Sequence, residues 1–243
     1  MHSDETTDID ILYSNLRHCT NNDNENVVLI KTGALNPIHR SHISNLVQTK
    51  QYLEQIHHFN VLGGYISPTH DDYVHGKLHD EQIPAKHRIE MCQKAIEEAK
   101  EQHWLRVDKA ECMAHKFVRF SNVACSLQNF INDKLKLPRY VRVIYVSGLD
   151  LFNRCGGIRQ LRKSNMGVAV VYRPGEHENL VKTNDPNLFY VPIDDEAKLA
   201  IQDVSSTKIR HNLKNNVPCD QLTYTSVLDY LKMIPISSQK RHS

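Results

Sequence analysis

The 243-residue sequence has no apolar run that approaches the roughly 20 residues needed to cross a bilayer, so we expect no membrane partner. Its formal net charge of +2 is too small to predict nucleic-acid binding from bulk electrostatics. The opening stretch, MHSDETTDID, has neither the apolar core of a signal peptide nor the arginine-rich character of a transit peptide. These absences favour an intracellular protein, cytoplasmic or nuclear.

Signatures of metal clusters and disulfides are also missing. The six cysteines form no CxxC pair, which is typical of reduced thiols rather than of a zinc cluster or a disulfide framework. The 15 histidines stand at irregular spacings, so we expect no dedicated metal site.

What the sequence does contain is a series of short apolar runs that alternate with helical patterns. An uninterrupted run such as Val27–Ile30 is typical of a strand buried on both faces. The alternation predicts right-handed βαβ units, and therefore an α/β fold with a Rossmann-like, doubly wound parallel sheet and helices on both faces. The expected strands cover residues 27–30, 59–66, 104–107, 140–146, 167–172 and 188–191, and the expected helices cover 43–56, 84–99, 123–135, a stretch from 206, and 222–233.

Residues 26–234 are expected to form one domain, because neither an internal repeat nor a low-complexity linker interrupts them. Residues 1–25 are predicted as a flexible lead-in that includes a short helix near residues 8–16. Residues 235–243 are predicted as a loose tail.

Ligands of such sheets bind beyond the carboxyl ends of the strands. One connection there, residues 67–84, is rich in His and Asp and is predicted as a long polar loop. The rule directs attention to the loops that follow Ile30, Ile66, Val107, Val146 and Tyr172.

The first of these loops reads GALNPIHRSH, from Gly33 to His42. Its glycine lets the backbone turn sharply and come close to a ligand. His39 and His42 are three residues apart, which places both on one side of the first turn of the following helix. A helix N-terminus offers free N–H groups and a partial positive charge, so the segment predicts a phosphate site. A lone HxxH is more often two exposed histidines on a capped helix, but the preceding strand, the glycine and the proline favour phosphate binding.

A second candidate segment is VSSTKIR, residues 204–210. Its serines and threonine can cap the first N–H groups of a helix, and capping alone would explain them. Lys208 and Arg210 add two cations, and guanidinium and hydroxyl groups both donate to phosphate oxygens. The segment is therefore a second candidate polyphosphate site.

Together the two segments resemble the (H/T)xxH and SSTxxR signatures of the nucleotidyltransferase superfamily. More closely, the chain resembles the eukaryotic-type nicotinamide mononucleotide (NMN) adenylyltransferase family from about Val27 to Leu231. Four internal segments, GGYISPTHDDY, IPAKHRIEM, WLRVD and VSGLD, match the NMN-specific branch in the same order. The resemblance implies an enzyme that joins AMP from ATP to NMN, or to its acid form, and releases pyrophosphate.

The resemblance also implies roles for individual residues. His39, His42 and Arg210 would be catalytic, and Mg²⁺ would bridge the ATP phosphates without a dedicated carboxylate cage. ATP would contact Gly33, Ala34, Leu35, His39, His42, Ser205, Ser206, Thr207 and Arg210, and NMN would contact Tyr73, Lys77, Trp104, Gly148 and Asp150.

The chain departs from the family pattern in ways that bear on the acceptor. Leu35 stands where an aromatic residue is usual, the lysine-rich stretch after Tyr73 is reduced to VHGK, and Trp104 is the only tryptophan. Because one aromatic wall of a nicotinamide pocket is missing, adenylyl transfer is better supported than NMN as the acceptor. A phosphopantetheine adenylyltransferase, a CTP-using cytidylyltransferase and a nucleotide-binding protein without catalysis stay open as alternatives, as does a homo-oligomeric state.

Overall fold

The computed structural model describes residues 1–19, 23–162, 165–173, 175, 180, 184–193 and 204–234. At its centre is a six-stranded sheet with the order β3-β2-β1-β4-β5-β6, in which all neighbouring strands run parallel. The chain crosses from the edge strand β3 to β4, which lies beside β1, so the sheet is doubly wound as the alternating pattern predicts. The predicted tail over residues 235–243 lies outside the described residues.

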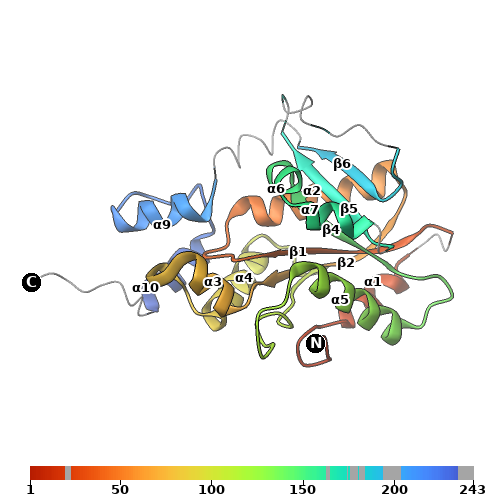
Figure 1. Ribbon diagram of the computed structural model, residues 1–243, viewed down its shortest axis with the longest axis horizontal. Helices are drawn as coiled ribbons and strands as arrows, with labels where there is room; N and C mark the ends of the chain where they lie inside the picture. Colours follow the sequence, from red (N-terminus) through yellow and green to blue (C-terminus); the bar gives the residue numbers. More distant parts are fainter. Residues whose placement is uncertain are drawn as a thin grey trace, which may run out of the picture.

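Figure 1 shows the strands as a twisted central layer between helices. The strands are β1 (Asn26–Gly33), β2 (Asn60–Pro68), β3 (Leu105–Val107), β4 (Arg142–Gly148), β5 (Gly167–Tyr172) and β6 (Leu188–Pro192). The helices of the described ranges are α1 (Asp10–Arg17), α2 (Arg40–Ile56), α3 (Asp71–Leu78), the 3-10 turn η1 (His79–Glu81), α4 (Ala85–Glu98), α5 (Phe120–Leu135), α6 (Leu149–Arg154), α7 (Gly156–Leu161), α9 (Ser206–Lys214) and α10 (Thr225–Met233).

The strands are apolar on both faces, and helices therefore cover both. Two adjacent glycines of β2 show how closely the covering side chains approach the strand. A Cβ on Gly63 would lie 2.6 Å from Leu12 of α1, whereas a Cβ on Gly64 would lie 2.7 Å from the ring of Trp104 on the other face. Helices α1, α5 and α7 pack on the first face, and α2 and α4 pack on the second. Neither glycine has room for a side chain, so β2 is enclosed between the two layers.

The N-terminal segment is part of this packing. Ile11 and Leu12 of α1 are buried against β2. The hydroxyl of Thr7 donates to the carboxylate of Asp108 at 2.7 Å, and both side chains are buried. Over its described residues, the segment predicted as a flexible lead-in is therefore folded against the sheet, because its apolar side chains cover the glycine surface of β2.

The connection over residues 67–84 differs from the prediction. Instead of a polar loop it contains α3 and η1. His70 caps α3 by accepting a hydrogen bond from the N–H of Asp72 at 3.2 Å, and Val74 is the buried residue of the helix. A helix that buries one side chain leaves no apolar period in the sequence, and this is why the prediction is wrong there. The six-residue helices α6 and α7 are too short to show a period, and they were not predicted.

The described helices include none that is long and apolar enough to cross a membrane. All six cysteines are free thiols. Burial raises the pKa of the Cys112 thiol to about 12, so this group stays protonated near neutral pH.

Candidate active site

The loop after β1 is held in place on both sides. β1 ends at Gly33, and the chain then turns at Leu35, whose side chain is buried and whose φ of 48° lies in the left-handed region that leucine rarely adopts. The Asn36 side chain is fully buried. Its amide donates to the carbonyl of Glu81 at 2.8 Å, and its oxygen accepts from the N–H of Ile83 at 2.7 Å. These bonds therefore fix the position of the 33–42 loop, and with it the start of α2, at the carboxyl end of β1.

His39 and His42 meet at the start of α2. Their rings stack with centroids 3.6 Å apart and planes 28° apart. The backbone N–H of His39 donates to Nδ1 of His42 at 3.1 Å, so neutral His42 carries its proton on Nε2 and can donate from there. Nδ1 of His39 is buried, and the backbone N–H of His42 faces it in a capping box without full hydrogen-bond geometry. The pair thus keeps polar groups available for a ligand.

Burial makes both histidines neutral. Burial, followed by the charge of Lys31, lowers the pKa of His39 to about 3. Burial, followed by the charges of His39 and Lys31, holds the pKa of His42 well below its usual value. Burial also lowers the pKa of Lys31, to about 8. Near neutral pH the histidines are therefore hydrogen-bonding rings without charge, and the cation beside them is Lys31.

Helix α9 brings the second candidate segment to the same loop. Ser205 is its N-cap, and the Ser205 hydroxyl accepts a backbone N–H of the first turn at 3.2 Å. The hydroxyl of Ser206 donates to the carbonyl of Pro37 at 2.8 Å, and Nη1 of Arg210 donates to the carbonyl of Asn36 at 3.0 Å. Figure 1 shows α9 at the end of the sheet where α3 also lies. The structure therefore brings the two segments together.

The carboxylate of Glu81 is paired with two cations of α9, Arg210 and Lys214. Nε of Arg210 donates to Oε2 of Glu81 at 2.8 Å, and Lys214 pairs with the other oxygen. Hydrogen bonds from Lys214 and Arg210 hold the pKa of Glu81 below its usual value. The exposed hydroxyl of Thr207 lies 3.5 Å from Nη2 of Arg210. A polyphosphate that binds these cations must compete with Glu81.

Arg88 of α4 connects the loops that follow the carboxyl ends of β1 and β2. Its side chain is fully buried and donates to the carbonyls of Ile83 at 2.8 Å, Ala34 at 2.9 Å and Thr69 at 2.7 Å. It also forms an ion pair with Asp71 at 2.8 Å. One guanidinium thus joins the loop after β1, the loop after β2 and the start of α3. The sequence segment IPAKHRIEM includes this residue, but the sequence alone gave it no role.

The aromatic residues predicted for the acceptor pocket lie in different places. Tyr73 of α3 is 46% exposed and stacks on Phe117, which is 37% exposed, with centroids 4.9 Å apart and planes 20° apart. Both lie on segments that follow the carboxyl ends of β2 and β3. Trp104 directly precedes β3, is 2% exposed and packs on Gly64. The structure does not bring Trp104 to the 33–42 loop, because it lies at the amino end of its strand. The sequence prediction overlooked Phe117.

The other predicted acceptor contacts are open to solvent. Lys77 on α3 and Asp150 in the first turn of α6 are exposed. Gly148 ends β4, and a Cβ on it would meet no atom within 4 Å. This end of β4 therefore has space beside it. Among the described residues, no group of three or more His, Cys, Asp or Glu side chains is placed to hold a metal ion.

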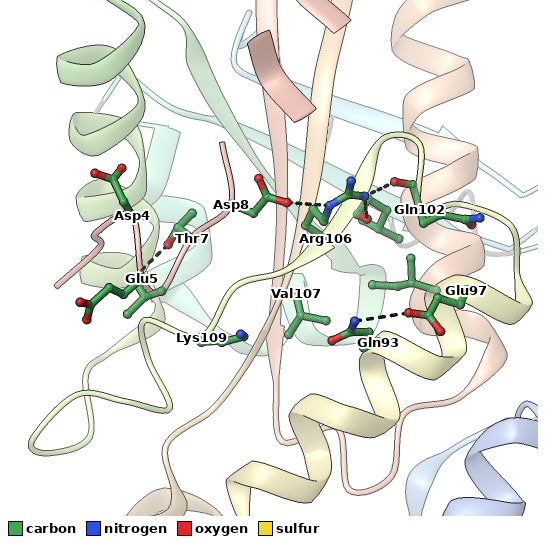
Figure 2. Close-up of a pocket in the computed structure, with 13 residues that line it drawn as sticks. Asp4, Glu5, Thr7, Asp8, Gln93, Glu97, Gln102, Arg106, Val107 and Lys109 are labelled. Carbon is green, nitrogen blue, oxygen red and sulfur yellow. Dashed lines mark hydrogen bonds and ion pairs between the residues drawn. The ribbon is translucent and has the colours of Figure 1, made fainter. Parts of the chain in front are cut away.

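A cleft of about 490 Å³ lies elsewhere, along the outer edge of β3 (Figure 2). It separates the N-terminal segment from α4. Arg106 of β3 crosses it and pairs with Asp8 at 2.9 Å, and the amide of Gln93 bonds Glu97 on the α4 side. The polar side chains just named are already paired within the chain. The cleft is also separated from the 33–42 loop, because β2 lies between β3 and β1. We therefore take the 33–42 loop, rather than this cleft, as the candidate active site.

Comparison with known proteins gives a family and a fold. A model of the cytidylyltransferase-like family matches residues 30–212. The nicotinamide/nicotinic acid mononucleotide adenylyltransferase 2 of Danio rerio is 33% identical over 117 residues, which are 48% of this chain and 35% of that protein. The aligned part thus spans about a third of that relative. The nicotinamide/nicotinic acid mononucleotide adenylyltransferase of Arabidopsis thaliana is 27% identical over 218 residues, which are 85% of this chain and 87% of that protein.

Among solved structures, the nicotinic acid mononucleotide adenylyltransferase of Plasmodium falciparum complexed with NaAD superposes with a TM-score of 0.56. The match covers 86% of this chain and 95% of that one at 12% identity. At this identity the likeness shows a shared fold, and the six-stranded parallel sheet is its common core.

Proposed function

The chain belongs to the cytidylyltransferase-like family, and from that premise we propose that it is an adenylyltransferase that joins AMP from ATP to NMN or to nicotinic acid mononucleotide. One observation carries the proposal: Ser206 and Arg210 both donate to carbonyls of the 33–42 loop. A single site then combines neutral histidine donors, the N-terminus of a 17-residue helix and a second, cationic helix start. That combination suits a polyphosphate chain.

The proposed reaction needs no nucleophile from the protein, because the 5′-phosphate of the acceptor is already an anion. One of its oxygens attacks the α-phosphorus of ATP and a new P–O bond forms. The bond from that phosphorus to the bridging oxygen breaks, and its electron pair leaves with pyrophosphate. The protein must align two anions and stabilise the developing charge.

The geometry suggests how the residues divide this work. His42 would donate its Nε2 proton in a hydrogen bond to the α-phosphate, beside the N–H groups that open α2. Ser206 and Arg210 would hold the β- and γ-phosphates. Mg²⁺ would enter with ATP as part of the substrate and neutralise phosphate charge.

The names of the relatives and one aromatic pair support a pyridine nucleotide as the acceptor. Tyr73 and Phe117 form a partly exposed stacked surface beside the sheet edge, on which a planar ring can lie. This surface would replace the missing tryptophan wall. Trp104 has no part in the proposed pocket, since its indole is buried under α2 and against β2.

The test is a chromatographic assay of the full-length chain with ATP, Mg²⁺ and either mononucleotide. We expect NAD or its acid analogue to form together with an equal amount of pyrophosphate. A reaction without acceptor is the control and should release no pyrophosphate.

The alternatives give different results in the same assay. Pyrophosphate release only with CTP, or only with 4′-phosphopantetheine, would move the protein to another branch of the superfamily. ATP binding without pyrophosphate release from any phosphorylated acceptor would identify a nucleotide-binding protein without catalysis. Either result contradicts the proposed function.

A further inference from the structure

Lys31 is a buried cation in a strand of otherwise apolar residues. Its side chain is 9% exposed, and it lies two residues before Gly33, where β1 ends. It pairs in register with Ile66 of β2, while the next residue, Thr32, points to the opposite face and bonds the hydroxyl of Tyr145 at 2.8 Å. Lys31 therefore points to the face that α2 covers.

Nothing in the described part of the chain neutralises this charge. Among the described residues Lys31 has neither an ion pair nor a side-chain hydrogen bond, and its Nζ is not among the fully buried polar atoms, so the ammonium group is accessible although most of the side chain is buried. The charge of Lys31 acts on His39 and His42 at the start of α2, and the N-terminus of that helix adds to the positive potential there. A largely buried cation without a partner, near the positive end of a helix, lowers stability unless an anion binds there. The arrangement points to an anionic ligand.

We propose that the ammonium group of Lys31 contacts the α-phosphate of ATP, the phosphoryl group that is transferred. This inference rests on the proposed function and names a further residue of the same site. As the acceptor oxygen attacks and the bond to pyrophosphate breaks, negative charge gathers on the non-bridging oxygens of the α-phosphate. A cation fixed in a buried position stabilises that charge more than a solvated one does.

The position of Lys31 separates its task from that of Arg210. Arg210 donates to the outer side of the 33–42 loop and shares Glu81 with Lys214. Lys31 instead lies on β1, on the face of the sheet that α2 covers. A nucleotide between the two would place its α-phosphate at Lys31 and the histidines, with its terminal phosphates toward α9.

A structural role and a ligand role for Lys31 give opposite predictions for Lys31→Met. Methionine keeps the unbranched shape of the buried stem and lacks only the terminal ammonium group. Replacement of a buried charge by an apolar side chain is often neutral or stabilising. We therefore expect the melting temperature to stay the same or to rise, while kcat falls by about 10²–10³-fold.

Binding measurements with AMP and adenosine test the contact without any transfer. The two ligands differ by the α-phosphate alone. We expect the wild-type protein to bind AMP more tightly than adenosine by about tenfold or more, and we expect Lys31→Met to lose most of that preference. Lys94→Met is the matched control: Lys94 is on the surface of α4, pairs with Glu90 and contacts no residue of the site, so its AMP preference should stay unchanged.

The readouts separate this inference from the proposed function. If the wild type forms no dinucleotide but Lys31→Met still loses the AMP preference, the proposed acceptor chemistry fails and the Lys31 contact stands. If Lys31→Met keeps kcat within about threefold and keeps the AMP preference, or loses melting temperature with that preference intact, the inference is overturned. Should Lys31→Met not fold, Lys31→Gln removes the charge with a polar side chain and carries the same measurements.

Discussion

Two segments, residues 31–42 and residues 204–214, meet beyond the carboxyl end of β1, and they differ in burial and in charge. The first is buried: His39 is 8% exposed, its ring is neutral, and the loop is held by Asn36 and Arg88. The second is a helix two of whose cations share the Glu81 carboxylate; the side chain of Lys214 is 56% exposed and that of Arg210 is 12% exposed.

This difference suggests that the first segment stabilises the transition state and that the second segment binds the incoming polyphosphate. Groups held in a water-poor environment do not have to reorganise when charge develops, and they suit the transition state. Charges at the surface act over a longer range and are screened by salt, and they suit the first capture of a polyanion. Changes in the first segment should therefore affect mainly kcat, and changes in the second should affect mainly ATP affinity and its salt dependence.

His42→Ala tests this division with the largest expected effect. It removes a positioned donor, so we expect kcat to fall by about 10²–10³-fold. The dissociation constant of ATP should change by less than about tenfold, because the contact strengthens in the transition state. Steady-state kinetics and calorimetric ATP binding measure the two quantities separately.

His57→Ala is the matched control, because His57 caps the opposite end of the same helix. It should leave kcat unchanged. If His42→Ala weakens ATP binding as much as it lowers kcat, then His42 is a ground-state binding residue and the proposed division fails.

The buried histidines also predict how stability depends on pH. His39 has a pKa of about 3 in the folded chain and about 6.5 when unfolded. Between these values the unfolded state binds a proton that the folded state does not, so the free energy of unfolding falls as the pH is lowered. Below about pH 6 the loss approaches about 1.4 kcal/mol per pH unit for each such histidine. His42, whose pKa is also lowered, contributes with the same sign.

Urea denaturation between pH 7 and pH 4.5 measures this slope. His39→Asn should make it shallower, whereas His103→Gln, at an exposed position, should leave it unchanged. An unchanged slope in His39→Asn would show that the ring is protonated in the folded state, and the contrast between a neutral and a charged segment would then be wrong.

Periodicity was enough to predict the architecture, because the elements that build the core bury many residues. The strand predicted over residues 167–172 has those bounds in the structure, and helix α10 begins three residues after the predicted start at 222. That difference has a cause: the Thr223 hydroxyl donates to the carbonyl of Ile38 at 2.7 Å, which holds this stretch in a turn. Helix α3, with one buried residue, gave no pattern to predict from.

The candidate site was predictable in part for a similar reason. Local spacing indicated that His39 and His42 share one side of a helix, but their protonation depends on burial and on Lys31, which only the folded chain reveals. One signal was present in the sequence: a lysine in the run VVLIKTG marks a charge inside a buried strand. The acceptor role of Trp104 came from the resemblance of WLRVD to the family pattern, whereas the structure has this side chain buried at the amino end of β3.

The smallest expected effect belongs to the exposed segment, where Glu81→Gln removes the carboxylate that Arg210 and Lys214 share. Because a polyphosphate competes with this carboxylate, we expect ATP binding to tighten by about two- to fivefold at low salt and kcat to stay the same. The gain should shrink as salt is added, since exposed charges are screened. Asp80→Asn, on the same turn η1, is the control and should leave affinity unchanged. Weaker ATP binding in Glu81→Gln would instead mean that Glu81 holds Arg210 in its binding position, and the exposed segment would then be preorganised much as the buried one is.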